Sequence, residues 1–94
     1  MVEMILKDDE MKGKVLDKLA RYRYWCGRHT SIDNLPKGFP KHMRKDVMRI
    51  IKEMKRDDLI VWKPTSYGEQ VSLNIMMKDE IQSLIDRFLL RKYK

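Results

Sequence analysis

The sequence has a single cysteine, Cys26, and no apolar run approaching the roughly 20 residues that a membrane-spanning helix needs. One cysteine cannot form a disulfide within the chain, which fits a reducing compartment. The opening stretch, MVEMIL, is short and carries an acid, so we do not expect a signal peptide. Low-complexity tracts and internal repeats are also missing. We therefore expect one small domain over residues 1–94, in the cytoplasm, with no membrane partner.

Positive charge is plentiful but unevenly distributed. The net charge is +7, and residues 37–56 hold eight Lys and Arg against two Asp and Glu. Residues 1–36 are nearly balanced, and residues 57–94 are balanced. A local excess of this kind raises the potential at one place on the surface, which attracts polyanions such as nucleic acid.

The basic segment has the pattern of an amphipathic helix. Its apolar residues recur at the 3.6-residue period, and they are Met43, Val47, Ile50, Ile51 and Met54. The opposite face carries only cations and a histidine: Lys41, His42, Lys45, Arg49, Lys52 and Arg56. The acids Asp46, Glu53 and Asp57 gather on one flank. Pro40 suits the first position of this helix, because its missing N–H needs no partner there.

The other elements follow from local signals. After an N-terminal arm (1–8), the acids at Asp8–Glu10 and an apolar period predict a first helix over 9–26, with Tyr22 and Cys26 buried and Gly27 as its stop. Capping residues at Thr30–Asp33 predict a short second helix over 31–36, with Ile32 and Leu35 facing inward. A β-branched run, a turn and an alternating run predict a hairpin over 59–74. Helical periodicity returns over 76–91.

This order of elements resembles the winged helix-turn-helix superfamily, and the stretch Leu35–Asn74 is similar to small archaeal winged-helix DNA-binding proteins. The resemblance implies a mainly α fold with a small β-hairpin, in the order α-α-α-β-β-α. We allow for a short extra strand before the second helix. It also implies that residues 31–57 form the helix-turn-helix and residues 59–74 the wing. No enzyme and no cofactor are expected.

The resemblance further implies double-stranded DNA binding, by a transcriptional regulator or a chromatin-associated factor of the nucleoid. Lys41, His42, Lys45 and Arg49 would read base edges, and Lys52 and Arg56 would contact phosphate. The full set of expected DNA-binding residues is Lys37, Lys41, His42, Arg44, Lys45, Arg49, Lys52, Arg56, Lys63, Thr65, Ser66 and Tyr67. There are three alternatives. The basic face is simply solvated, or it binds RNA, or the protein is an adaptor for an acidic protein partner, with Tyr24, Trp25 and Trp62 as an apolar patch.

Three further groups of residues have two interpretations each. Tyr22 is expected in the core, and Tyr24 and Trp25 are expected to pack against the N-terminal arm, the last helix or a partner. The alternative for all three is a platform that stacks single-stranded bases. Cys26, His29 and His42 are too few for a structural zinc site, so we expect no metal. The last helix has an apolar stripe that either closes the core against the first helix or, like the first helix, forms a homodimer interface. That stripe consists of Ile81, Leu84, Ile85, Phe88 and Leu89.

Overall fold

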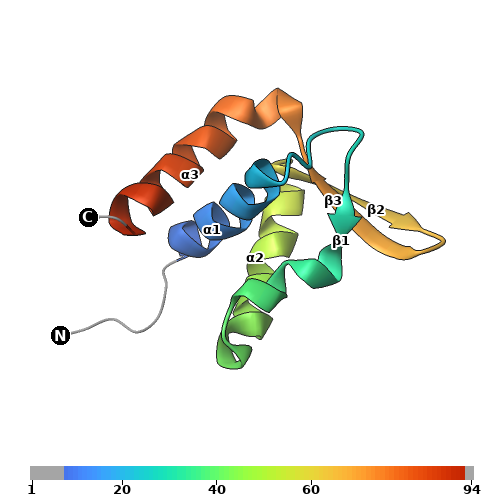
Figure 1. Ribbon diagram of the computed structural model, residues 1–94, viewed down its shortest axis with the longest axis horizontal. Helices are drawn as coiled ribbons and strands as arrows, with labels where there is room; N and C mark the ends of the chain where they lie inside the picture. The colour runs from blue at the N-terminus through green and yellow to red at the C-terminus, as the bar shows by residue number, and fades with distance from the viewer. Residues whose placement is uncertain (1–7, 93–94) are drawn as a thin grey trace.

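The computed structural model describes residues 8–92, with side chains through residue 90 (Figure 1). Three helices and three short strands form a mainly helical domain with one small antiparallel sheet. Their bounds are α1 (Asp8–Arg21), β1 (Thr30–Ser31), α2 (Arg44–Arg56), β2 (Ile60–Thr65), β3 (Gly68–Leu73) and α3 (Lys78–Lys92). The predicted arm, residues 1–8, lies outside the described residues except for Asp8. No helix within residues 8–92 is long and apolar enough to cross a membrane.

The sheet has the strand order β1-β3-β2, with β3 in the middle. Strands β2 and β3 form the predicted hairpin, in a register that pairs Ile60 with Leu73 and Thr65 with Gly68. β1 pairs antiparallel with β3 through Thr30 and Val71. This two-residue strand confirms the extra strand for which the sequence left room. In Figure 1 the hairpin projects away from α1 and α3.

All three helices and the sheet contribute to one core. Its fully buried side chains include Leu16 of α1, Val47 and Ile51 of α2, Leu73 of β3 and Ile81 of α3. The apolar stripe predicted for the basic helix is confirmed, because every one of its residues is buried. This burial fixes the rotation of α2 about its axis and therefore decides which of its side chains face solvent.

The first helix is shorter than predicted and ends at Arg21 instead of residue 26. Arg23 takes a left-handed conformation (φ 61°) and donates its backbone N–H to Ala20 O at 3.0 Å. Tyr24 N donates to Leu19 O at 2.9 Å, which completes a Schellman-type helix end. Because the helix stops here, the prediction that Tyr22 and Cys26 are buried is wrong. Tyr22 is 60% exposed, and Cys26 is exposed too.

The predicted second helix is replaced by two 3₁₀ turns, Ile32–Asn34 and Pro36–Gly38. Pro36 has no N–H to donate to Ile32 O, so Leu35 N makes that bond at 3.1 Å and the turn tightens. Ser31 caps the first turn by accepting a hydrogen bond from Asp33 N, and Ile32 and Leu35 are buried as predicted. A third 3₁₀ turn, Lys41–Met43, precedes α2, so the α-helix begins at Arg44 and not at Pro40.

Helix α3 begins after a 3₁₀ turn and packs closely on α1. A Cβ added to Gly13 would lie 2.4 Å from Phe88 Cβ and 2.7 Å from Leu84 O, so only glycine permits this approach. Ile81, Ile85 and Phe88 are buried within the monomer, while Leu84 and Leu89 are half-buried. The buried part of the stripe therefore closes the core against α1 within one chain.

Candidate nucleic-acid interface

The outward side of α2 follows from its buried side. Lys45, Lys52 and Arg56 lie roughly opposite the buried stripe at about 100° per residue, and all three are exposed. Lys45 and Lys52 are two helical turns apart on the same face. Among the described residues, neither has a carboxylate within ion-pair distance. The N–H donors of these two ammonium groups therefore face solvent and are available to a partner.

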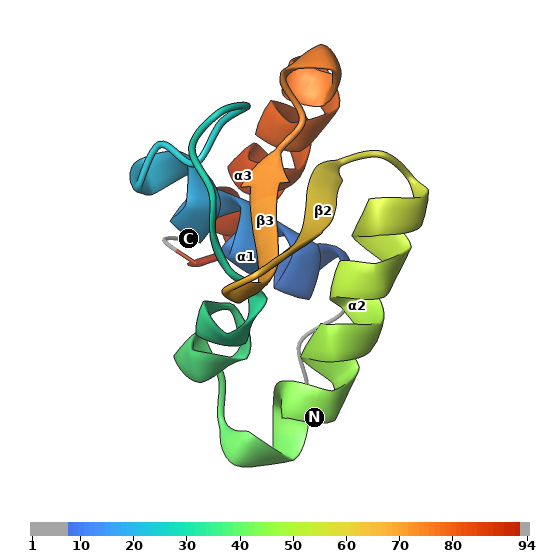
Figure 2. The same ribbon diagram turned by 90° about the vertical axis from the view of Figure 1, so that its right-hand side faces the viewer.

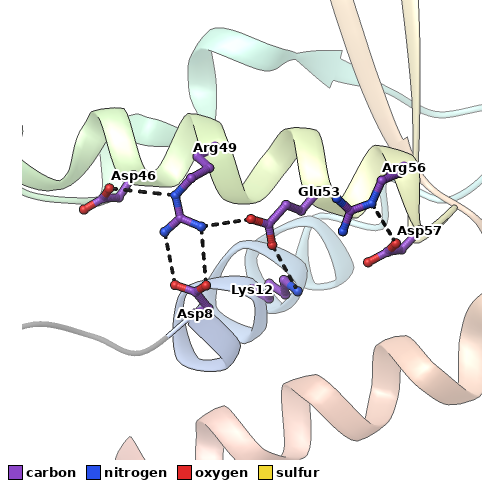
Figure 3. A network of polar contacts seen from close by, with 7 residues as sticks. All are labelled: Asp8, Lys12, Asp46, Arg49, Glu53, Arg56 and Asp57. Atoms are coloured by element: carbon purple, nitrogen blue, oxygen red, sulfur yellow. Dashed lines mark hydrogen bonds and ion pairs between the residues drawn. The ribbon is translucent and has the colours of Figure 1, made fainter.

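One flank of α2 faces α1 and carries the acids. Asp46 and Glu53 lie on this flank, and Arg49 lies between them (Figure 3). The Arg49 guanidinium is 2.9 Å from Glu53 Oε2, 3.2 Å from Asp8 Oδ1 and 4.0 Å from Asp46 Oδ1. Lys12 of α1 adds a further contact, 3.6 Å from Glu53. The result is a network, the α1-side network, that joins the start of α1 to the middle of α2.

The α1-side network changes the proton affinities of two of its members. The hydrogen bond from Arg49 lowers the pKa of Asp8; burial opposes this effect, and the positive charges of Arg49 and Lys12 add to it. The hydrogen bonds to Asp8 and Glu53 raise the pKa of Arg49 further above its ordinary value. Arg49 was predicted to read base edges, but three carboxylates surround it. Arg49 therefore differs from Lys45 and Lys52, because it is ion-paired within the fold and, among the described residues, they are not.

The other flank of α2 faces the hairpin and carries no acid. It consists of Arg44, Met48 and Lys55, and α2 runs beside β2 (Figure 2). Lys55 Nζ lies 5.2 Å from the centre of the Trp62 ring, a cation–π distance. Arg44 Nε donates to Phe39 O at 3.4 Å, and the Arg44 side chain is exposed. Lys45 and Lys52 lie between Arg49 and this flank, so we call Arg44, Lys45, Lys52 and Lys55 together the hairpin-side cations.

Sequence reasoning missed Lys55, which was absent from the predicted set. Its position in the helix is near the edge of the buried stripe, four residues after Ile51, which made it look like a boundary residue. The signal for its role is Trp62, whose ring reaches it only after β2 has folded back beside α2. A residue pairing of this kind is invisible to helical periodicity.

The remaining predicted residues lie at the two ends of this surface. Lys41 and His42 are exposed in the turn that leads into α2, and neither has a partner among the described residues. Lys37 is exposed in an earlier turn, with Nζ 3.4 Å from Asn34 Oδ1. At the C-terminal end of α2, Arg56 Nε is 3.3 Å from Asp57 Oδ1, so its charge is partly compensated.

The hairpin contributes less than predicted, because its turn uses one of its donors. Thr65 Oγ1 donates to Gly68 O at 2.7 Å and accepts from Tyr67 N at 3.1 Å. The Thr65 hydroxyl therefore stabilises the turn, and Gly68 supplies the positive φ that the turn needs (106°). Ser66 and Tyr67 form the tip, where the Tyr67 side chain is 92% exposed. Lys63 is exposed on β2 and has no partner among the described side chains.

An acid and an indole lie together on the hairpin, where Glu69 pairs with Pro64 next to the turn. Trp62 Nε1 donates to Glu69 Oε1, so Glu69 places a negative charge beside β2. Trp62 is half-buried, as are Tyr24 and Trp25, which pack against the core. The apolar patch suggested for an adaptor role is therefore largely covered in the monomer.

The candidate metal ligands do not come together. His29 Nδ1 lies 3.1 Å from Gln70 Oε1, Cys26 is exposed in the same connection between α1 and β1, and His42 precedes α2. In the described part of the chain, no three His, Cys, Asp or Glu side chains are arranged to hold a metal ion. The charged surface beside the hairpin is thus the most developed feature outside the core.

Comparison of the chain with protein-family models, with curated proteins and with solved structures finds no match.

Proposed function

We propose that the protein is a winged helix that binds double-stranded DNA, acting as a transcriptional regulator or a chromatin-associated factor. In this proposal α2 enters the major groove and the β2–β3 hairpin is the wing, lying beside the phosphate backbone. A major groove about 12 Å wide admits one α-helix. The observation that carries the proposal is the set of hairpin-side cations on α2, which face solvent beside a projecting hairpin and have no carboxylate partner among the described residues.

The roles of individual residues follow from their positions in the helix. Lys41 and His42 lie in the turn just before α2, and Lys45 lies in its first turn, at the end that contacts base edges in helix-turn-helix proteins. Lys52 and Lys55 lie further along and are suited to phosphate. Ser66 and Tyr67 at the hairpin tip, with Lys63 on β2, would contact the backbone of the neighbouring groove. Arg49 has a structural role in this proposal and is left out of the interface.

The charge pattern also predicts how the affinity depends on salt. Each phosphate neutralised by a lysine or arginine releases condensed counterions, which adds about 0.9 to the steepness of log K against log salt. Four hairpin-side cations therefore predict a slope of roughly −3 to −4 for a mixed-sequence duplex. A sequence-independent architectural protein would keep this slope on any duplex, whereas a regulator would select a preferred sequence.

The test is to measure binding of a fluorescent mixed-sequence duplex by anisotropy over a range of salt concentrations. It is combined with selection of bound sequences from a random duplex pool. A steep negative slope supports DNA binding, and an enriched palindrome would identify a regulator that binds as a dimer. Retention on heparin without any duplex binding would contradict the proposal and favour an acidic protein partner instead.

A further inference from the structure

A second cationic surface lies away from α2, around the end of α1. Between Asp17 and Asp33 the chain has no acid, while it carries Lys18, Arg21, Arg23 and Arg28. The net charge of residues 1–36 is close to zero because the acids of that region lie before and after this stretch. The stretch itself is cationic. The surface borders β1, whereas α2 packs beside β2, at the opposite edge of the sheet (Figure 2).

Two tyrosines bring an aromatic element to this surface. The Schellman-type end of α1 turns the chain so that Tyr22 is 60% exposed and Tyr24 is half-buried. Their ring centres are 6.2 Å apart, and the rings are tilted by 35°. The Arg28 guanidinium lies 6.0 Å from the centre of the Tyr24 ring. An exposed tyrosine face next to cations is the combination that stacks a nucleobase and holds its phosphate.

The tyrosines border a hollow of about 210 Å³ whose rim is polar and ordered. Lys18 Nζ donates to Asn34 O at 2.6 Å, and Lys37 Nζ lies 3.4 Å from Asn34 Oδ1. Asn34 Nδ2 in turn donates to Thr30 Oγ1 at 2.8 Å. Each ammonium has three N–H donors and uses one here, so both lysines retain donors for a phosphate. No acid lines this hollow among the described residues.

Tyr22 also borders a second, larger hollow of about 500 Å³, which continues toward Phe39 and Phe88. Asp17 is present there, but it is buried and paired with Arg21 at 3.0 Å. Tyr22 and Lys18 therefore line both hollows. An exposed ring that borders both spaces is available for a base entering either of them.

We propose that the surface formed by Tyr22, Tyr24, Lys18 and Lys37 binds unpaired nucleotides of a single-stranded nucleic acid. A base stacks on Tyr22, and Lys18 and Lys37 bind the adjoining phosphates. Duplex DNA does not fit this surface in the same way, because its base faces are covered by stacking. The inference is independent of the proposed role of α2 and survives if duplex binding fails.

The test uses two strands with equal charge. Wild-type protein is titrated against a labelled oligothymidylate of about ten nucleotides and against an abasic strand of the same length. We expect the oligothymidylate to bind about tenfold tighter, since base–aromatic stacking gives affinity that phosphates alone do not. The electrostatic contribution of α2 is the same for both strands and cancels in this ratio.

The variant Tyr22→Ala should bring the ratio of the two affinities close to one, while Tyr22→Phe, which keeps the ring, should preserve it. Tyr67→Ala is the matched control, because it removes another exposed tyrosine at the hairpin tip and should preserve the ratio. A melting curve verifies that Tyr22→Ala is folded. Equal affinities of the wild type for the two strands, or a ratio unchanged in Tyr22→Ala, would overturn the proposal. So would loss of the ratio in Tyr67→Ala.

Discussion

On the α1 side of α2, Arg49 lies among three carboxylates, Asp8, Asp46 and Glu53, and α1 adds Lys12. On the hairpin side of the same helix, Arg44 and Lys55 lie beside a carbonyl and an indole, and no ion pair involves them within the described residues. Both sides carry basic residues from one segment of sequence. Charge on the first side is satisfied within the fold and joins two helices. Charge on the second side remains available, so only that side raises the surface potential.

The comparison shows that the number of basic residues overstates the size of an interface. Residues 37–56 hold eight Lys and Arg, yet Arg49 is engaged by α1 and Arg56 is close to Asp57. A surface that binds a polyanion needs cations whose partners lie outside the protein. If DNA binds as proposed, substitutions on the hairpin side should change duplex binding, and substitutions on the α1 side should change stability.

The largest effect is expected for Lys45→Ala with Lys52→Ala. Removing two cations of the proposed interface should weaken duplex binding about 30-fold near physiological salt and make the salt slope shallower by about 1.8. Both side chains are exposed and unpaired among the described residues, so the melting temperature should stay within about 1 °C. Anisotropy and thermal melting check the two parts. Wild-type affinity in a folded double mutant would remove the hairpin-side cations from the interface.

Arg49→Gln tests the other side of α2 and should act on stability. It leaves Asp8, Asp46 and Glu53 without their shared cation, so the melting temperature should fall by about 1–4 °C. Duplex affinity should fall less than about threefold, because this cation is already engaged. Lys45→Gln is the charge-matched control and should show the reverse pattern. If Arg49→Gln weakened binding as much as Lys45→Gln, the distinction between the two sides would be wrong.

Lys55→Gln tests whether the surface formed by the hairpin-side cations extends to Lys55. We expect a three- to fivefold loss of duplex affinity and a salt slope shallower by about 0.9. The tryptophan emission should also shift, because Lys55 lies over the Trp62 ring. Lys78→Gln, at the start of α3, removes the same charge away from α2 and should leave binding nearly unchanged. Equal losses in the two variants would show that only net charge matters.

The smallest effect is a dependence of stability on pH that comes from Asp8. Its folded-state pKa lies below the ordinary 3.8, so the contact with Arg49 stabilises the fold above that pH and is lost as the pH falls through the lowered value. The wild type should melt about 1–2 °C above Asp8→Asn at neutral pH, and this gap should close in acid. A gap that is the same at neutral pH and below pH 3 would mean that the charge of Asp8 is irrelevant.

The parts of the fold that sequence predicted well are those with a local periodic signal. The period of Val47, Ile50, Ile51 and Met54 places α2 on the core, and all four are buried. The alternating strands around Gly68 predict the hairpin and its turn. The i, i+4 spacing of Arg49 and Glu53 is a local signal for an ion pair on the helix surface, and it was not used in the prediction.

What sequence did not predict depends on residues far apart or on rare backbone conformations. Arg23 adopts the positive φ that usually marks a helix end at a glycine. Because this position is not a glycine, the end of α1 and the exposure of Tyr22 were not predicted. Asp8 meets Arg49 across 41 residues, and Lys55 meets Trp62 only through the hairpin. These contacts decide which cations of α2 are available to a partner outside the protein. They cannot be predicted from the residue pattern of α2 alone.

The most direct test of the difference between the two sides of α2 is a ¹H–¹⁵N titration of the protein with a mixed-sequence duplex. We predict that the largest amide shifts fall on Lys45, Met48, Lys52 and Lys55 of α2 and on the hairpin tip at Ser66 and Tyr67. The amides of Asp8, Lys12 and Glu53, in the α1-side network, should change little. Shifts centred on that network, or no shifts at a duplex excess, would contradict the account.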